Sequence, residues 1–296
     1  MMPSKAKVPA GMAFITLAMA VFAVQDAMTR ILVESISPLQ IMTVRLWIFA
    51  SGAMIFAAWK GRLRQTLRPA RPVLQILRAS FSALEMILIA WALKYLGLAE
   101  THALFASFPL MAALMAAVAL GERLDRARGV AILGGFAGAL LILRPGTGVF
   151  RPQAFLALGA AALFAAYQVA GRMAARHDGF LTSIVQISMI GAILLTPAGL
   201  WAWQAPDAWQ WTMILAISAA GIGGHLLLVR ALEHAPASLL QPFNYFLLAF
   251  ATLIGVFWFG ERPGWLSMTG ALIIAACGLF AIHQTWREHR APLKFD

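Results

Sequence analysis

The chain has 296 residues, of which 61% are hydrophobic and only 12% are charged. Because soluble domains carry about 25% charged residues, this composition excludes an ordinary water-soluble protein. The formal net charge of +11 would also suit a protein that binds nucleic acid, so the positions of the basic residues must decide between nucleic acid and membrane.

Several uncharged stretches are long enough to cross a lipid bilayer. Residues 153–171, 179–206 and 235–260 each reach the length of about 18 residues that is typical of a transmembrane helix. Since the bilayer offers no water to unpaired backbone groups, the sequence predicts an all-α integral membrane protein. A signal peptide is not expected, because no A-x-A-like cleavage site precedes a soluble domain after the apolar run at residues 10–24. The single cysteine, Cys277, excludes a disulfide and a metal site built from cysteines.

Hydropathy predicts ten transmembrane helices, at residues 10–33, 38–59, 72–93, 101–119, 127–144, 152–174, 180–203, 208–231, 236–258 and 264–285. With the N-terminus inside, the inner segments hold sixteen lysines and arginines, whereas the outer segments hold four, namely Lys94, Arg144, Arg151 and Arg262. This bias follows the positive-inside rule and predicts two cytoplasmic termini, in what we expect to be a bacterial inner membrane. The basic charge therefore requires no nucleic-acid partner.

Charged and polar side chains interrupt the first three predicted helices. Gln25 and Asp26 lie late in the first helix, and Arg45 lies about two turns inside the second. Arg78 and Glu85 in the third helix are seven residues apart, so they share a face, and Glu85 is expected to contact Arg78 or an amino group. Ionised groups in a bilayer cost roughly 2.5–3.5 kcal/mol each on insertion scales and usually face a cavity or a partner. The charged residues therefore belong either to a binding site or to structural ion pairs, with Arg45 the better candidate for a structural role.

Prolines are predicted to bend one helix in each half of the chain. Pro109 lies in the middle of the fourth predicted helix, which begins near His102. Pro242 lies in the ninth predicted helix, just before Asn244 and Tyr245. Because proline removes a backbone hydrogen bond, each residue is expected to mark a broken or bent helix.

An internal repeat relates the two halves. The stretch VFAVQDAMTR at residues 21–30 returns as LFAAYQVAGR at residues 163–172, and Gly-Glu-Arg occurs at residues 121–123 and again at 260–262. We therefore divide the chain into two five-helix repeats, residues 1–146 and 147–296. Five is an odd number, so the repeats are predicted to have opposite orientations, which is the inverted-repeat architecture of secondary transporters with a midplane binding site.

Longer segments carry a family resemblance that covers nearly all of the chain. It resembles the ten-helix EamA-type branch of the drug/metabolite transporter superfamily in ALKYLGLAETHALFASFPLMAALMAAVALGER (92–123), GGFAGALLILRPG (134–146), YQVAGR (167–172), GHLLLVRALEHAPASLLQPFNYF (224–246) and FGERP (259–263). The resemblance implies export or exchange of small metabolites, including amino acids and, in related branches, riboflavin or S-adenosylmethionine. The chain is also similar to aromatic amino-acid exporters, with Glu85, Tyr167 and Tyr245 at motif positions.

The predicted substrate-binding site combines polar and aromatic side chains from both halves. Amide and hydroxyl groups would bind the amino and carboxyl ends of an amphipathic substrate, and rings would pack against its side chain. Hydrogen bonds that merely join helices are the alternative for the polar residues, and contact with lipid is the alternative for the phenylalanines. The histidines could bind a carboxylate, carry protons or pack as hydrogen-bonded residues. The candidates are Gln25, Asp26, Arg78, Glu85, His102, Phe108, Phe164, Tyr167, Gln168, His225, Asn244 and Tyr245.

These patterns predict a transporter rather than an enzyme. The sequence has no P-loop motif and no arrangement for covalent catalysis or metal binding, so we assign no catalytic residue, metal or cofactor. The expected function is secondary transport of a small amphipathic metabolite, first of all export of amino acids with aromatic or apolar side chains, by alternating access. The alternatives are a transporter of riboflavin or another aromatic metabolite, a membrane-embedded lipid-modifying enzyme and a conduction pore.

Overall fold

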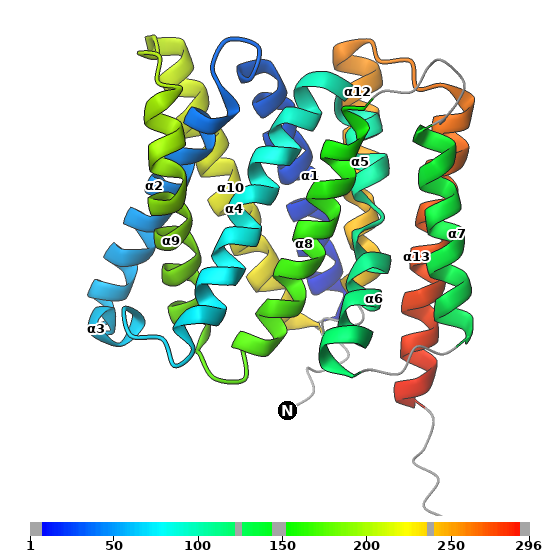
Figure 1. The fold of residues 1–296 in the computed structure, drawn as a ribbon, viewed down its shortest axis with the longest axis horizontal. Coiled ribbons are helices and arrows are strands. Elements are labelled where there is room, and N and C mark those ends of the chain that lie inside the picture. The colour runs from blue at the N-terminus through cyan, green and yellow to red at the C-terminus, as the bar shows by residue number, and fades with distance from the viewer. Residues whose placement is uncertain (1–7, 122–125, 144–151, 236–239, 291–296) are drawn as a thin grey trace, which may run out of the picture.

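The computed structural model describes residues 8–121, 126–143, 152–235 and 240–290, and these residues form a helical bundle without a β-strand (Figure 1). The helices of the first half are α1 (Val8–Leu32), α2 (Pro38–Trp59), α3 (Leu63–Thr66), α4 (Pro72–Leu96), α5 (Leu98–Phe105), α6 (Phe108–Leu120) and α7 (Arg126–Leu143). Those of the second half are α8 (Ala154–Ala174), α9 (Phe180–Trp201), α10 (Ala208–His234), the 3-10 helix η2 (Gln241–Asn244), α12 (Tyr245–Phe259) and α13 (Trp265–Arg290).

The lengths and composition of the helices confirm an all-α membrane protein. Within the described part of the chain, seven spans are long and apolar enough to cross a bilayer when α5 and α6 are taken as one span, Leu98–Leu120. Three shorter apolar helices lie at Gly129–Leu143, Tyr245–Phe259 and Trp265–Phe280. The count of ten spanning helices stays a prediction.

Both predicted helix breaks are confirmed. α5 ends at Phe105 and α6 begins at Phe108, so that Pro109 occupies the first turn of α6, where its missing N–H leaves no gap in the hydrogen-bond ladder. In the second half Pro242 lies within η2, and the regular helix α12 begins only at Tyr245. The predicted start of this ninth helix, residues 236–239, lies outside the described residues, as do Glu122 and Arg123 of the first Gly-Glu-Arg stretch.

Helices of the first half pack in pairs against helices of the second half. The main pairs are α1 with α10, α2 with α9, α4 with α8, α5 with α12 and α7 with α13, the last pair lying at one edge of the bundle (Figure 1), while α4 also contacts α9, α1 also contacts α12 and α6 also contacts α8. Let α1, α2, α4, α5 and α7 correspond in order to α8, α9, α10, α12 and α13. Exchanging the halves then converts the α1–α10 pair into the α8–α4 pair and leaves the other three pairs unchanged. A two-fold relation between the halves would produce this set of contacts.

Close packing of backbones holds α7 and α13 together. A side-chain carbon added to Gly138 would lie 2.8 Å from the carbonyl oxygen of Gly270, so only glycine permits this approach. Small residues at such contacts are typical of helices that pack within a membrane. The polar residues considered below lie on the other helix pairs, chiefly α1, α2, α4, α5, α8 and α10.

Candidate functional site

A carboxylate and an imidazole meet between α1 and α5. Asp26 Oδ2 lies 3.2 Å from His102 Nε2, and the side chains are 15% and 2% exposed, respectively. Gln25 Nε2 donates to Asp26 Oδ1 at 3.2 Å. Neither ring nitrogen of His102 makes a hydrogen bond of normal geometry within the described part of the chain. The pair is therefore a close electrostatic contact that leaves hydrogen-bonding capacity for a further group.

Arg45 and Glu85 extend this charged group toward α2 and α4. Glu85 is buried, and it interacts electrostatically with both Asp26 and Arg45. Gly221 on α10 makes room for the group, since a Cβ at that position would lie 2.7 Å from Gln25 Oε1 and 3.3 Å from Arg45 Nη2. We call Asp26, Arg45, Glu85 and His102 the charge cluster. It contains two carboxylates but only one permanently cationic side chain.

Aromatic rings continue from the charge cluster along α5, α6 and α8. The centroid of Phe105 lies 6.4 Å from that of His102 and 5.4 Å from those of Phe108 and Phe164. Phe108 and Phe164 meet edge to face at 4.9 Å, and Phe164 stacks on Tyr167 at 5.7 Å with an interplanar angle of 28°. These four side chains, Phe105, Phe108, Phe164 and Tyr167, form what we call the aromatic row.

Arg78 lies at the far end of the aromatic row. Its guanidinium carbon is 4.9 Å from the centroid of the Tyr167 ring, and Nη2 donates to Tyr167 Oη at 3.4 Å. A Cβ on Gly171 would approach Arg78 Nε to 3.2 Å, so the small residue lets the guanidinium rest against α8. The expected contact between Arg78 and Glu85 is replaced by this contact with Tyr167. The aromatic row therefore has an ionisable or cationic group at each end.

A narrow crevice lies where the two helix breaks meet. His102, Phe105, Phe108 and Pro109 line it from α5 and α6, and Asn244 and Tyr245 line it from η2 and α12, together with Ala106, Leu247 and Leu248. Its free volume is about 20 Å³, which is room for roughly one water molecule. The Tyr245 hydroxyl lies against Gly278 on α13 and has no hydrogen-bond partner within the described residues. A metabolite could enter this crevice only after the helices separate.

The remaining predicted site residues lie around this core. His225 on α10 is exposed and packs edge-on against Phe22 and Phe49 at 5.2 and 5.6 Å, while its Nδ1 lies 2.8 Å from the Gly221 carbonyl oxygen. Gln168 is half-buried on α8, next to Tyr167. The structure thus brings Asp26, Glu85 and His102 together. It also joins Phe108, Phe164 and Tyr167 in the aromatic row, which reaches His102 through Phe105.

Sequence reasoning missed several contributors. Arg45 was singled out from sequence as a candidate for a structural role, and the structure adds that it lies within the charge cluster; Gly221 carried no signal beyond its small size. Phe22 and Phe49 surround His225 but look like any other phenylalanine in an apolar helix. Arg45 could be found from sequence because an arginine in the interior of an apolar helix is rare.

Comparison with solved structures supports the fold. One solved chain superposes with a TM-score of 0.62 and 19% sequence identity, and the match covers 96% of this chain and 99% of the other. At this identity the likeness concerns the architecture alone.

Several bacterial transporters are similar in sequence. A riboflavin transporter of Vibrio cholerae is 29% identical over 235 residues, which are 77% of this chain and 78% of the relative. An S-adenosylmethionine uptake transporter of Rickettsia bellii is 22% identical over 92% of this chain and 93% of its own. A pseudopaline exporter of Pseudomonas aeruginosa is 27% identical over 68% of this chain and 72% of its own. These names do not confirm the specific similarity to aromatic amino-acid exporters that we expected.

The family comparison covers both halves of the chain. The EamA-like transporter family matches residues 9–144 and then, a second time, residues 151–282. Together these ranges include the charge cluster, the aromatic row and both helix breaks. The chain belongs to the EamA-like transporter family.

Proposed function

We propose that this protein is a secondary transporter that moves a small amphipathic metabolite with a flat aromatic ring by alternating access. The two halves would be inverted repeats that rock about a site near the membrane midplane. Two observations support the repeat: the family matches the chain twice, and the helix pairs are preserved when the halves are exchanged. The basic-residue bias supports two cytoplasmic termini.

The aromatic row carries the proposal about the substrate. Phe108, Phe164 and Tyr167 are only half-buried, so their faces are available to a planar group once the helices separate. Stacked and edge-to-face ring pairs are each worth about 0.5–1.5 kcal/mol beyond burial, which favours an aromatic ligand over an aliphatic one of similar size. The row lies between Arg78 and the charge cluster, so the substrate should be polar at both ends of its aromatic part.

The charge cluster needs one further positive charge, which a proton or a cationic group of the substrate would supply. Arg45 compensates one of its two carboxylates, so Asp26 and Glu85 together need one more positive charge. A proton shared among Asp26, Glu85 and His102 can supply it, and so can a cationic group of the substrate. Since uncompensated charge is costly away from water, the proton and the substrate cation should compete for this cluster.

We rank a riboflavin-like metabolite ahead of an aromatic amino acid on the grounds of the aromatic row and the relatives. Because riboflavin carries no cationic group, the shared proton would then supply the positive charge that the charge cluster needs. The polar groups of an amino acid lie at one end of its ring, whereas the aromatic row has polar groups at both ends. A similar relative is named as a riboflavin transporter, and another, which transports S-adenosylmethionine, also handles a metabolite with an aromatic ring. Relatives named for uptake and for export both occur, so the proposal specifies no direction.

Counterflow in proteoliposomes tests this function. Vesicles that contain the purified protein and unlabelled riboflavin should accumulate labelled riboflavin transiently, and excess phenylalanine should compete weakly. A Phe164→Leu variant should retain folding and lose most of the uptake, because leucine keeps the bulk but not the ring. Counterflow of phenylalanine without counterflow of riboflavin would favour the amino-acid alternative, and equal rates in protein-free vesicles would reject both.

A further inference from the structure

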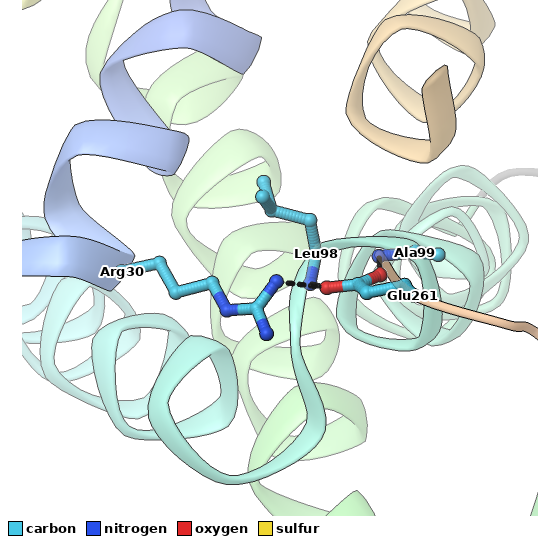
Figure 2. Close-up of polar contacts among 4 residues, drawn as sticks. All are labelled: Arg30, Leu98, Ala99 and Glu261. Carbon is cyan, nitrogen blue, oxygen red and sulfur yellow. Dashed lines mark hydrogen bonds and ion pairs between the residues drawn. The ribbon is translucent and has the colours of Figure 1, made fainter. Parts of the chain in front are cut away.

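One carboxylate joins three elements at the end of the bundle where α1 finishes and α5 begins (Figure 2). Glu261 follows α12 in the chain. The Leu98 N–H donates to Glu261 Oε1 at 2.7 Å, and the Ala99 N–H donates to Oε2 at 2.9 Å. The Arg30 guanidinium forms an ion pair with the same carboxylate. We call these four residues, Arg30, Leu98, Ala99 and Glu261, the latch.

The residues around the latch leave room for the Glu261 carboxylate, so the contact differs from an incidental pair of surface charges. A Cβ added to Gly97 or Gly255 would collide with the Glu261 carboxylate, and Gly97 has a positive φ of 83° that turns the chain into α5. Arg30 lies with its guanidinium carbon 4.1 Å from the centroid of the Phe259 ring. Its side chain is 21% exposed and that of Glu261 is 13% exposed. Charge-assisted hydrogen bonds in such a partly buried setting are stronger than those of exposed ion pairs.

The latch lies one helical turn from the charge cluster. Arg30 follows Asp26 by four residues on α1, and Leu98 precedes His102 by four residues on α5, which is about 6 Å along each helix. The same two helices therefore carry the Asp26–His102 contact and, one turn farther on, the latch. Glu261 also lines a hollow of about 360 Å³, together with Ala99 and Arg262 among other described residues. Residues of the latch thus line this hollow, and no residue of the charge cluster is among its described lining residues.

We propose that the latch is the outer gate of the transporter, which must release before the site can exchange substrate with the outside. This inference rests on the alternating access proposed above, but it does not depend on which metabolite is moved. The structure has the latch closed, and opening would separate the Glu261 carboxylate from Arg30 and from both backbone donors. The end of the bundle with the latch is the end that the basic-residue bias predicts to face outside.

The labelling rate of a single cysteine placed behind the latch reports whether the gate is open or closed. In a Cys277→Ala background, Ala27→Cys places a thiol in the buried group that also contains Leu98, on the inner side of the latch. A membrane-impermeant maleimide applied to intact cells should label it slowly while the latch is closed. Glu261→Gln removes the charge but keeps the shape, and it should raise the labelling rate about tenfold, because hydrogen bonds to a charged group are much stronger than neutral ones.

Matched variants separate the gate from other effects. Glu233→Gln disrupts an exposed Arg230–Glu233 pair and should leave the labelling of Ala27→Cys unchanged. Ala192→Cys, in a separate buried group, should stay unlabelled, so that labelling there would indicate general loosening of the fold. Ala205→Cys, in the exposed segment after α9, should be labelled equally with and without Glu261→Gln, which fixes the outer side.

A charge swap tests whether the backbone donors matter. Arg30→Glu combined with Glu261→Arg restores an ion pair but leaves the N–H groups of Leu98 and Ala99 without their acceptor, so fast labelling of Ala27→Cys should persist. Slow labelling in the swapped variant would show that an ion pair alone keeps the gate closed. It would overturn the gate in which the backbone N–H groups take part. Unchanged labelling in Glu261→Gln, with transport retained, would overturn the gate and leave the proposed transport function standing. If the protein without any substitution shows no counterflow, the proposed function is rejected instead.

Discussion

Tyr167 offers the sharpest test of the aromatic row, because its ring has two distinct neighbours. It stacks on Phe164 at 5.7 Å and lies under the Arg78 guanidinium at 4.9 Å. A cation–π contact contributes about 0.5–2 kcal/mol, and burial of a large side chain against a ligand contributes roughly 1.5–3 kcal/mol. Because part of the ring is already committed to Arg78 and Phe164, we expect Tyr167→Ala to weaken binding of an aromatic substrate by about 1–3 kcal/mol, a five- to two-hundred-fold loss of affinity.

A second variant, Tyr167→Phe, separates the contribution of the Tyr167 ring from that of its hydroxyl. The Arg78–Tyr167 hydrogen bond is long, at 3.4 Å, so Tyr167→Phe should lower affinity less than about threefold, while retaining the cation–π contact. Competition uptake with a large aromatic substrate and a small substrate measures both effects. Tyr167→Ala should discriminate against the aromatic substrate, and Gln25→Ala should affect both substrates more evenly. Equal losses for both substrates in Tyr167→Ala would mean that the ring holds helices together and does not select the cargo.

Three further results are expected. Glu85→Gln should reduce transport per molecule at least severalfold with near-normal expression, since it removes the carboxylate that calls for a proton or substrate cation; poor folding with normal transport per molecule would assign Glu85 to structure. A reporter fused after Asp296 should be active only if it functions in the cytoplasm, and strong activity of a periplasm-specific reporter there would contradict the predicted topology. Gly221→Ala should displace Gln25 and lower transport by about tenfold at unchanged yield, because the added carbon would lie 2.7 Å from the amide oxygen; normal transport would show that the amide can move without consequence.

The polar positions of the site could be found from sequence because ionisable residues are rare in apolar helices. Asp26, Glu85 and His102 stood out in this way, and they do lie close to one another. The two helix breaks were equally visible, since proline removes a backbone donor wherever it occurs. Both signals depend on a single residue and its immediate neighbours, so neither requires knowledge of the packing.

The partners of these residues could not be found in the same way. Arg78 and Glu85 share a face by spacing, yet Arg78 rests on Tyr167 from α8, which is 89 residues away in the chain. A helix that is apolar on all sides has no polar face that determines its rotation about its own axis. The sequence therefore does not determine which neighbouring helix a given side chain contacts. The latch was hidden for the same reason, because Arg30 and Glu261 are separated by 231 residues.

The placement of α5 suggests how the charge cluster and the latch act together. This helix has only eight residues, with the turn at Gly97 before it and the break at residues 106–107 after it. It carries His102 of the charge cluster and both backbone donors of the latch. A short helix bounded by a turn and a break has the ends at which hinges absorb large backbone changes, so we expect it to move as a unit. If the latch is the gate proposed above, a substrate that displaces His102 from Asp26 would also shift Leu98 and Ala99 relative to Glu261, whereas a helix continuous with α4 and α6 would resist the same displacement.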